Sequence, residues 1–180
     1  RDCRIDLPLA GMAHCELRLI NWGVRSDNPN TDFAFNDIQP GQALDILMGE
    51  EAEEPVFSGD ITAIEERYGD GAPQLVLLAE DKLHLLARLR DNRAHEETSI
   101  SDVISQLAQE ANLQADASLD TLGTWHQINE SHLAFMMRLT APYDIAIRLQ
   151  DGQVRARAEE EDADPVQLHA QQNVQTIRLI

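Results

Sequence analysis

Residues 127–139 read QINESHLAFMMRL and decide how the second half of the chain is interpreted. Asn129, Glu130, Ser131 and His132 stand side by side, as catalytic residues can, and an apolar segment follows at once. A serine hydrolase would need a base within hydrogen-bond reach of Ser131, but neighbouring residues on a helix point roughly 100° apart. We therefore interpret the polar run as the start of a helix, capped by Asn129 or Ser131.

In this interpretation Glu130 lies in the first helical turn, where its charge meets the positive end of the helix dipole. Leu133, Met136, Met137 and Tyr143 are then expected to point inward. The chain contains no G-x-S-x-G motif, so the sequence assigns no catalytic residues.

The composition restricts the class of protein. The chain has 180 residues, of which 43% are hydrophobic and 4% aromatic, and its formal net charge is −18. A chain this acidic repels phosphate backbones, which argues against specific nucleic-acid binding. No apolar run approaches the ~18 residues of a membrane span, so no membrane partner is expected. The start Arg1-Asp2-Cys3 lacks a methionine and a signal-peptide pattern, which indicates a processed or trimmed chain.

The first half shows the alternation of apolar and polar residues that is typical of half-buried strands. Turn sequences at residues 26–30 (SDNPN) and 39–42 (QPGQ) separate short strands, as in an antiparallel barrel or sandwich. Ile20, Trp22 and Val24 take the opposite phase to the residues before them, which predicts a bulge. The alternating positions are Cys3, Ile5, Leu7, Leu9, Cys15, Leu17, Leu19, Phe33, Phe35, Leu44, Ile46 and Met48.

The second half changes to a mixed pattern. Residues 83–89 have leucines at helical spacing but are short enough to be an irregular connection. The next run has apolar residues at offsets of three, four, seven, eight and eleven from Ile100, which predicts a helix over residues 99–111 with Ser99 and Asp102 as its capping pair. Alternating runs on either side of Asp151-Gly152 predict a β-hairpin. No internal repeat of fixed period is evident, and residues 173–180 (NVQTIRLI) read as a strand.

No cofactor or metal site is expected. Cys3 and Cys15 occupy apolar positions and are interpreted as small core side chains, with a bridge between adjacent strands as the alternative. No two histidines have the spacing that puts both on one helical face, and no glycine motif for phosphate binding is present. The acidic runs at 50–54 and 159–164 lack the spacing of a calcium loop and are interpreted as solvated loops. The six histidines are His14, His84, His95, His126, His132 and His169.

The order of these elements resembles the late control protein D family, the baseplate hub proteins of contractile-tail phages. The resemblance covers residues 40–158. The amino-terminal hub region of type VI secretion spike proteins is similar to this family. The matching positions are residues 57–59 (FSG), 98–108, 127–131 (QINES), Phe135 and Leu139.

The resemblance implies an α+β fold, in which a small antiparallel β-barrel like that of tail-tube proteins precedes an α/β region with two helices and a hairpin. It divides the chain into a barrel (1–95), the α/β region (96–158) and an acidic linker (159–180) leading into a second barrel that is apparently truncated. It also implies a homotrimer in the virion baseplate, assembled in the host cytoplasm, with the tail tube, central spike, tape-measure and baseplate wedge proteins as partners.

The expected function is therefore structural, the joining of tube to spike without enzymatic activity. The alternative is a cell-wall-active hydrolase of a similar machine, with the cluster around Ser131 as its site. If copies of the chain surround a channel, part of the acidic excess is expected to face the lumen and repel phosphate. The candidates for the lumen are Asp45, Asp60, Glu65 and Glu66.

Overall fold

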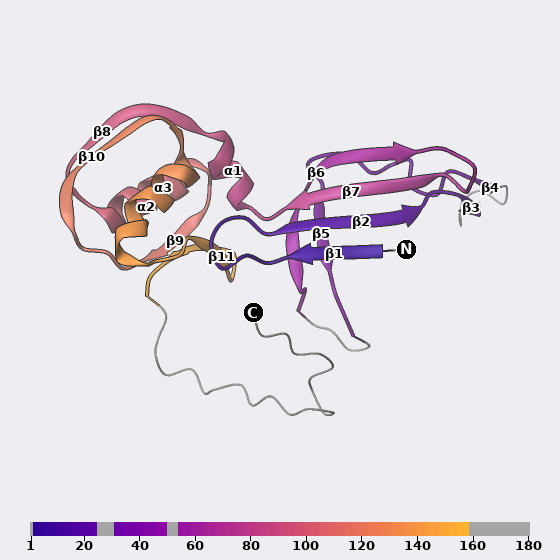
Figure 1. Cartoon of the computed structure of the whole chain (residues 1–180), viewed down its shortest axis with the longest axis horizontal. Coiled ribbons are helices and arrows are strands. Elements are labelled where there is room, and N and C mark those ends of the chain that lie inside the picture. Colours follow the sequence, from indigo (N-terminus) through magenta and orange to yellow (C-terminus); the bar gives the residue numbers. More distant parts are fainter. Residues whose placement is uncertain (1, 25–30, 50–53, 159–180) are drawn as a thin grey trace, which may run out of the picture.

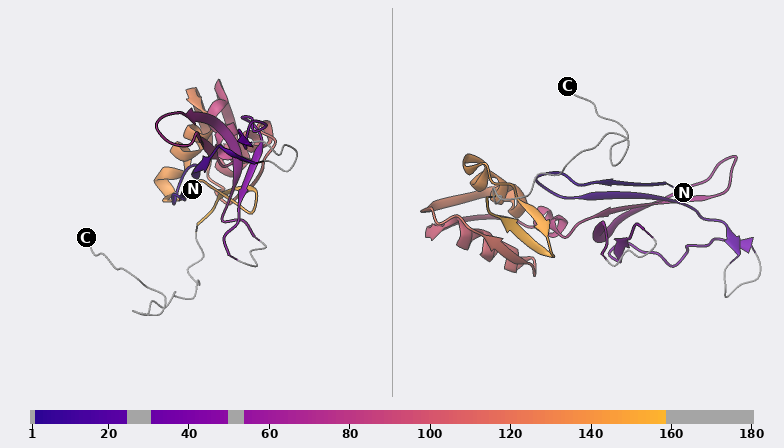
Figure 2. Two further views of the ribbon diagram at one scale, coloured as in Figure 1. Left: turned by 90° about the vertical axis from the view of Figure 1, so that its right-hand side faces the viewer. Right: turned by 90° about the horizontal axis from the view of Figure 1, so that it is seen from below.

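The computed structural model describes residues 2–24, 31–49 and 54–158. It is elongated, with an antiparallel sheet at one end and a unit of helices and strands at the other (Figures 1 and 2). Among the described residues the two ends have separate hydrophobic cores, which meet at a narrow junction around helix α1 (Leu83–Arg88). The sequence places domain boundaries after residues 95 and 158, and these boundaries stay a prediction.

The sheet has five strands in the order β1-β2-β7-β6-β5, and every neighbouring pair is antiparallel. It is curled but not closed, so the expectation of a closed barrel is wrong for the described residues. The strands β1 and β5 stay at opposite edges of the sheet, and part of the inner face is packed by residues of the segment between β4 (Thr31–Asp32) and β5, namely Phe35 and Ile38. The strands are β1 (Asp2–Asp6), β2 (His14–Ile20), β5 (Ala43–Ile46), β6 (Phe57–Arg67) and β7 (Gln74–Glu80).

The predicted alternation is confirmed within β1, β2 and β5, but it is wrong for Leu7, Leu9 and Met48, which lie outside the strands and are exposed. Leu17 and Leu19 of β2 pair with Leu77 and Leu75 of β7, and all four side chains belong to the core of the inner face. The predicted bulge at residues 20–24 is wrong. β2 ends at Ile20, and β3 (Gly23–Val24) pairs with β4 (Thr31–Asp32) as a separate ribbon. The register shift of the sheet lies instead in β6, between Ile61 and Ala63.

The other unit is built around two long paired strands, β8 (Arg90–Ser99) and β10 (Leu122–Ser131), which curve around α2 (Ile100–Glu110) and α3 (His132–Thr140) (Figure 1). Both helices were predicted from the sequence, but neither strand was. Residues 83–88, which the sequence left undecided, form a further helix, α1. Helix α2 confirms the predicted register, since Ile100, Val103, Ile104, Leu107 and Ala108 are buried.

This unit contains an internal repeat, contrary to the expectation of none. Residues 90–118 and 122–150 follow the same course with an offset of 131 − 99 = 32 residues. Both long strands have the same order of exposed, half-buried and buried positions, and both end in a serine that caps a helix. Backbone φ is positive at Glu97 and Asn129, and again at Asn112 and Asp144.

The hydrogen bonds obey the same symmetry. The N–H of Ile100 donates to the carbonyl of Thr121 at 3.2 Å, and its equivalent at His132 donates to Leu89 at 2.9 Å. The two copies are therefore related by an approximate two-fold axis through the β8–β10 pair. Identical residues stand only at Ser99/Ser131 and Leu107/Leu139.

The predicted hairpin at Asp151-Gly152 is confirmed. It joins β11 (Arg148–Gln150) to β12 (Gln153–Ala156), and both turn residues have positive φ, as a type I′ turn requires. The strand before it is shorter than the alternation indicated, because residues 141–143 form a 3-10 turn (η1, Ala141–Tyr143). β12 also pairs in parallel with β9 (Gln114–Ala117) and completes a small sheet on the unit.

Gly59, in the FSG segment of β6, allows two backbones to approach closely. A Cβ atom built there would overlap the carbonyl oxygen of Glu80 and lie 2.8 Å from Cζ of Phe57. Neither atom can move without disturbing the β6–β7 pair, because one is backbone and the other belongs to a buried ring.

We predict that Gly59→Ala lowers the free energy of unfolding by about 1–3 kcal/mol, the usual effect of overpacking. Gly71→Ala is the control, since nothing lies within 4 Å of its Cβ position, and its effect should stay within about 0.5 kcal/mol. Urea denaturation of both variants measures the difference. Equal stability of the two variants would contradict the close approach.

Candidate functional site

Ser131 has a structural role at the start of α3. Its backbone is extended, with φ −69° and ψ 156°, and its Oγ accepts a hydrogen bond from the N–H of Ala134 at 3.2 Å. Of the two caps that the sequence left open, Ser131 is therefore the one observed. Asn129 lies in the bulge of β10, where its N–H donates to the side chain of Asn92 at 2.8 Å.

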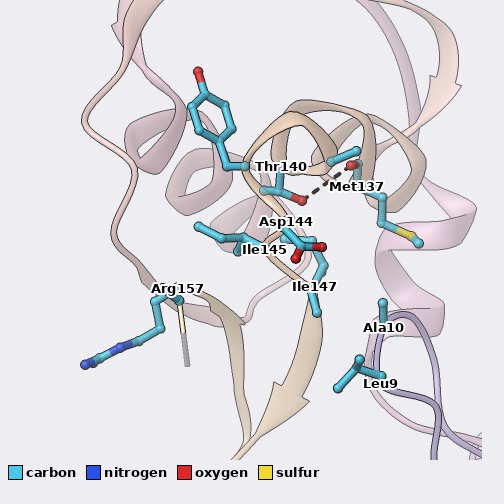
Figure 3. A pocket seen from close by; sticks show the side chains of 12 residues that line it. Leu9, Ala10, Met137, Thr140, Asp144, Ile145, Ile147 and Arg157 are labelled. Atoms are coloured by element: carbon cyan, nitrogen blue, oxygen red, sulfur yellow. Dashed lines mark hydrogen bonds between the residues drawn. The ribbon is translucent and has the colours of Figure 1, made fainter. Parts of the chain in front are cut away.

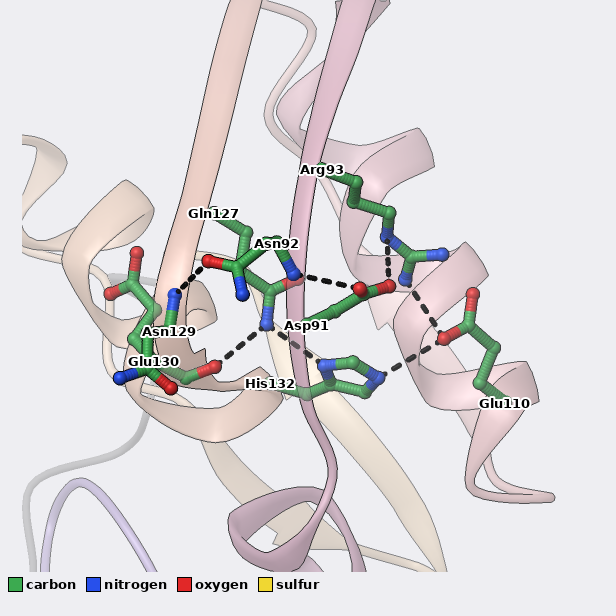
Figure 4. Close-up of polar contacts among 8 residues, drawn as sticks. All are labelled: Asp91, Asn92, Arg93, Glu110, Gln127, Asn129, Glu130 and His132. Carbon is green, nitrogen blue, oxygen red and sulfur yellow. Dashed lines mark hydrogen bonds and ion pairs between the residues drawn. The ribbon is translucent and has the colours of Figure 1, made fainter.

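His132 lies between two other side chains, those of Gln127 and Glu110 (Figure 4). Its Nδ1 is 3.0 Å from Nε2 of Gln127, and its Nε2 is 3.0 Å from Oε2 of Glu110 on α2. Because the Gln127 amide is the donor in the first contact, the imidazole carries its proton on Nε2 and donates to Glu110. The geometry therefore assigns His132 to a helix-to-helix contact and provides no nucleophile–base pair at Ser131.

Glu110 is the anion of this cluster. A hydrogen bond of 2.8 Å from Arg93, together with the charge of Arg93, holds the pKa of Glu110 below its usual value. Gln127 is 1% exposed and its amide also donates to the carbonyl of Glu130 at 3.0 Å. The cluster joins β8, α2, β10 and α3, so its effect is to hold the two copies of the repeat together.

Glu130 and two inward-facing residues differ from expectation. Glu130 belongs to β10 and not to the first helical turn, and its carboxylate accepts hydrogen bonds from Arg138 at 2.6 and 3.1 Å, which lowers its pKa. Leu133 and Met136 are buried as predicted, but Met137 is 37% and Tyr143 41% exposed. Met137 is exposed because it shares one face of the helix with Ala134 and Arg138, which are exposed as well.

A second cluster joins the sheet to the repeat unit. Asp60 of β6 accepts a hydrogen bond from Lys82 at 2.5 Å and contacts Nε2 of His84 at 2.9 Å. Burial alone would raise the pKa of Asp60, but the hydrogen bonds from His84 and Lys82 outweigh it and the pKa lies below the usual value. The buried Asp81 beside them accepts from the N–H groups of Ala13 and Leu83, each at 2.9 Å.

The acidic residues proposed for a channel wall have different environments. Asp60 is wrong as a candidate, because it is 9% exposed and bound to Lys82 and His84. Glu65 is paired with Arg67 at 2.7 Å and Glu66 accepts from the hydroxyl of Tyr68 at 2.6 Å. Asp45 is exposed on β5, an edge strand. The acidic runs lie outside the described residues, except for Glu54.

An open hollow of about 680 Å³ lies between the β1–β2 loop and the carboxyl end of α3 (Figure 3). Leu9 and Ala10 line one side, and Met137, Ile145 and Ile147 line the other. The polar groups at its rim are dispersed, with Thr140 Oγ1 turned to the carbonyl of Met137 at 3.3 Å. Nothing in it resembles a set of convergent catalytic groups.

The remaining sequence candidates lie apart. His14 pairs with Glu80 at 3.7 Å, His95 stacks on Phe135 with ring centroids 5.6 Å apart, and His126 is exposed. His169 lies outside the described residues. Across the described ranges no three His, Cys, Asp or Glu side chains come close enough to hold a metal ion, and no helix there is long and apolar enough to cross a membrane.

Both cysteines are free thiols. Cys15 pairs with Ile5 across β1 and β2, and Cys3 pairs with Leu17, so the two cysteines are diagonal neighbours on the inner face. Burial, and the proximity of Cys3, raise the pKa of Cys15 to about 12. This environment suits the small apolar side chain that the sequence analysis expected.

The sequence matches a family model. Residues 14–159 match the model described as phage tail baseplate hub (GPD), which is most of the chain. No curated protein matches the sequence.

Solved tail proteins have a similar fold. The 43 kDa tail protein of prophage MuSo2 from Shewanella oneidensis is 13% identical with a TM-score of 0.62, over 83% of this chain and 45% of that one. A tail protein from Neisseria meningitidis MC58 is 14% identical with a TM-score of 0.62, over 91% and 47%.

A third similar structure is a component of the type VI secretion system from E. coli, described as structurally similar to the T4 bacteriophage tail proteins gp27 and gp5. It is 11% identical with a TM-score of 0.52, over 87% of this chain and 48% of that one. The chain thus spans about half the length of each of these proteins.

Sequence reasoning missed the partners in both polar clusters. Glu110 lies 22 residues before His132, and Lys82 lies 22 residues after Asp60, so no local spacing connects them. The one available signal was the position of His84 among leucines, in the segment that the sequence left undecided. The structure buries this histidine.

We predict that Ser131→Ala lowers the free energy of unfolding by about 1 kcal/mol, the usual effect of losing a helix cap. Ser99→Ala is the matched variant, because Ser99 caps α2 in the other copy of the repeat and accepts from the N–H of Asp102 at 3.1 Å. Chemical denaturation should give similar losses for both. No loss in either variant would mean that the caps do not stabilise the helices.

We also predict that the protein becomes less stable in acid through Glu110. Since its folded-state pKa is lowered, its contribution is fully present above about pH 5 and is lost as the pH falls through the lowered value. Glu110→Gln should therefore be less stable than the wild type at pH 6, and the difference should shrink toward pH 3. The exposed Asp120→Asn is the control. A difference that does not change with pH would contradict this assignment.

Proposed function

The chain belongs to the phage tail baseplate hub (GPD) family, and we propose that it is a structural hub that joins the tail tube to the central spike of a contractile phage tail or a related injection machine. It acts by assembly and not by catalysis. Its partners are further copies of itself in a homotrimer, the tube, spike and tape-measure proteins, and the baseplate wedge. It assembles in the host cytoplasm and resides in the virion baseplate.

The observation that carries this proposal is the open sheet. Its edge strands β1 and β5 have no partner on their outer side among the described residues. A sheet edge presents unpaired backbone N–H and C=O groups, which are satisfied best by another strand. A curled sheet with two such edges suits a ring in which neighbouring copies continue one another's sheets.

The edge β1 also bears charges that restrict how copies meet. Asp2, Arg4 and Asp6 alternate with the inward Cys3 and Ile5. Two β1 strands paired antiparallel about Arg4 would place the two arginines opposite each other and each Asp2 opposite an Asp6. Like charges directly opposite destabilise a strand pair, so this self-pairing is disfavoured relative to pairing with a different edge.

The test uses the strain that encodes the protein. Deletion of its gene should abolish assembled tails that sediment as particles, and wild-type protein supplied in trans should restore them. Ser131→Ala and His132→Ala should restore them as well, because both residues have structural roles. Mass spectrometry of purified particles should detect the protein. Native mass measurement of the protein itself should give a homotrimer.

Two outcomes decide between the proposal and the hydrolase. If normal particles form without the protein, it is not a hub. If Ser131→Ala protein folds and enters particles but those particles lose an activity against the cell wall, the enzyme is supported instead.

A further inference from the structure

The end of the sheet farthest from the repeat unit bears a cluster of aromatic rings, near the β3–β4 ribbon in Figure 1. Trp22 and Phe33 meet edge to face with ring centroids 5.5 Å apart, and Phe33 and Tyr68 meet in the same way at 6.1 Å. We call these three residues the aromatic tip. The whole chain has only eight aromatic residues of these types, so three of them in one place is a strong concentration.

Buried hydrogen bonds of Asn21 support the aromatic tip. Asn21 is 3% exposed, its N–H donates to the carbonyl of Pro73 at 2.7 Å, and its Oδ1 accepts from the N–H of Phe35 at 2.8 Å. These bonds connect the segments on either side of Trp22, Phe33 and Tyr68. The rings are therefore preorganised, and a partner binding there would not have to order them.

The rings are nevertheless open to solvent. Trp22 is 46% and Tyr68 63% exposed, and the nearby Ile20 and Val24 are 48% and 68% exposed. Exposed tryptophan and tyrosine rings on a rigid support are the residues that most often supply the binding energy of an interface.

Among the described residues, the charged side chains around the aromatic tip are mostly acidic. Asp32, Glu66 and Asp70 are exposed there, while Arg67 is paired with Glu65 at 2.7 Å. A second copy of the same surface would bring its own acidic rim, and like charge across an interface opposes binding. A basic partner is attracted instead, and its arginine or lysine side chains can lie over the ring faces in cation–π contacts.

From these observations we propose that the aromatic tip is a docking site for a different protein of the assembly, whose contacting segment bears an apolar side chain flanked by arginine or lysine. This inference rests on the proposed function, because it supposes that the chain resides in a multiprotein particle. It adds to that function the chemistry of one partner and the surface that receives it.

The test is photocrosslinking inside assembled particles. Tyr68 is replaced by the photoreactive p-benzoylphenylalanine, and Leu122 is replaced likewise as the control, because it is 73% exposed on β10 of the repeat unit. Purified particles are irradiated, and the crosslinked peptide is identified by mass spectrometry. The expected product joins position 68 to another protein, at a segment with a basic residue beside an apolar one, and is absent for position 122.

Substitutions then test the chemistry. Trp22→Ala should reduce the crosslink at position 68 at least about tenfold, as expected for a residue that dominates an interface. Asp70→Lys should reduce it several-fold, whereas Asp120→Lys, at an exposed position of the repeat unit, should not. Raising the salt concentration during assembly should weaken the contact as well.

Each other outcome overturns the proposal. A crosslink from position 68 to a second copy of this chain, or to an acidic segment, contradicts the partner's chemistry. Particles that contain the protein but show no crosslink at position 68 overturn this inference and leave the hub function intact. Absence of the protein from the particles overturns the hub function, and the inference fails with it.

Discussion

The arrangement of the molecule depends on one carboxylate, that of Asp60. It lies on the sheet but is 13% exposed at its side chain, and it remains charged because Lys82 and His84 reach it from the start of α1. A buried carboxylate without such partners would be costly, so these contacts favour the orientation in which the sheet and the helix meet. Leu83 and Leu86, on the same helix, belong to the core of the repeat unit. This contact on the sheet therefore helps to position the unit, together with the hydrogen bond from the N–H of Gly11 to the carbonyl of Ile147 at 2.7 Å.

The features that the sequence predicted are those encoded within a few residues. A serine before an apolar run marks a helix start because the hydroxyl satisfies a backbone donor two or three residues on, and Ser99 and Ser131 both do this. Asp151-Gly152 marks a hairpin because both residues accept positive φ. The alternation in β1 and β2 was readable because the side chains of one face of these strands contribute to a core and those of the other face are more exposed.

Other features depend on contacts that no local pattern contains. β8 and β10 escaped prediction because bulges near Glu97 and Asn129 break their alternation, and because His95 and Gln127, which are polar, occupy their buried positions. The repeat is hidden because its two copies share a backbone course but only two identical residues, so that Glu96 in one copy corresponds to the exposed Ile128 in the other. The packing of Phe35 and Ile38 against the inner face of the sheet also follows from tertiary contacts alone.

The order of strands in the sheet has a consequence for the way the protein is made. β2 lies beside β7, and Ile20 pairs with Gln74, so the central pair of the sheet cannot form until β7 has left the ribosome. Until then the β1–β2 hairpin exposes Cys15, Leu17 and Leu19 without their cover. Pairing across such a separation is slow compared with the formation of local helices, and exposed strands are prone to aggregate. The repeat unit, by contrast, draws its two long strands from within 42 residues, Arg90 to Ser131. During synthesis the sheet can therefore complete its central strand pair only after β7 has emerged. The two long strands of the repeat unit emerge soon after one another and can pair early.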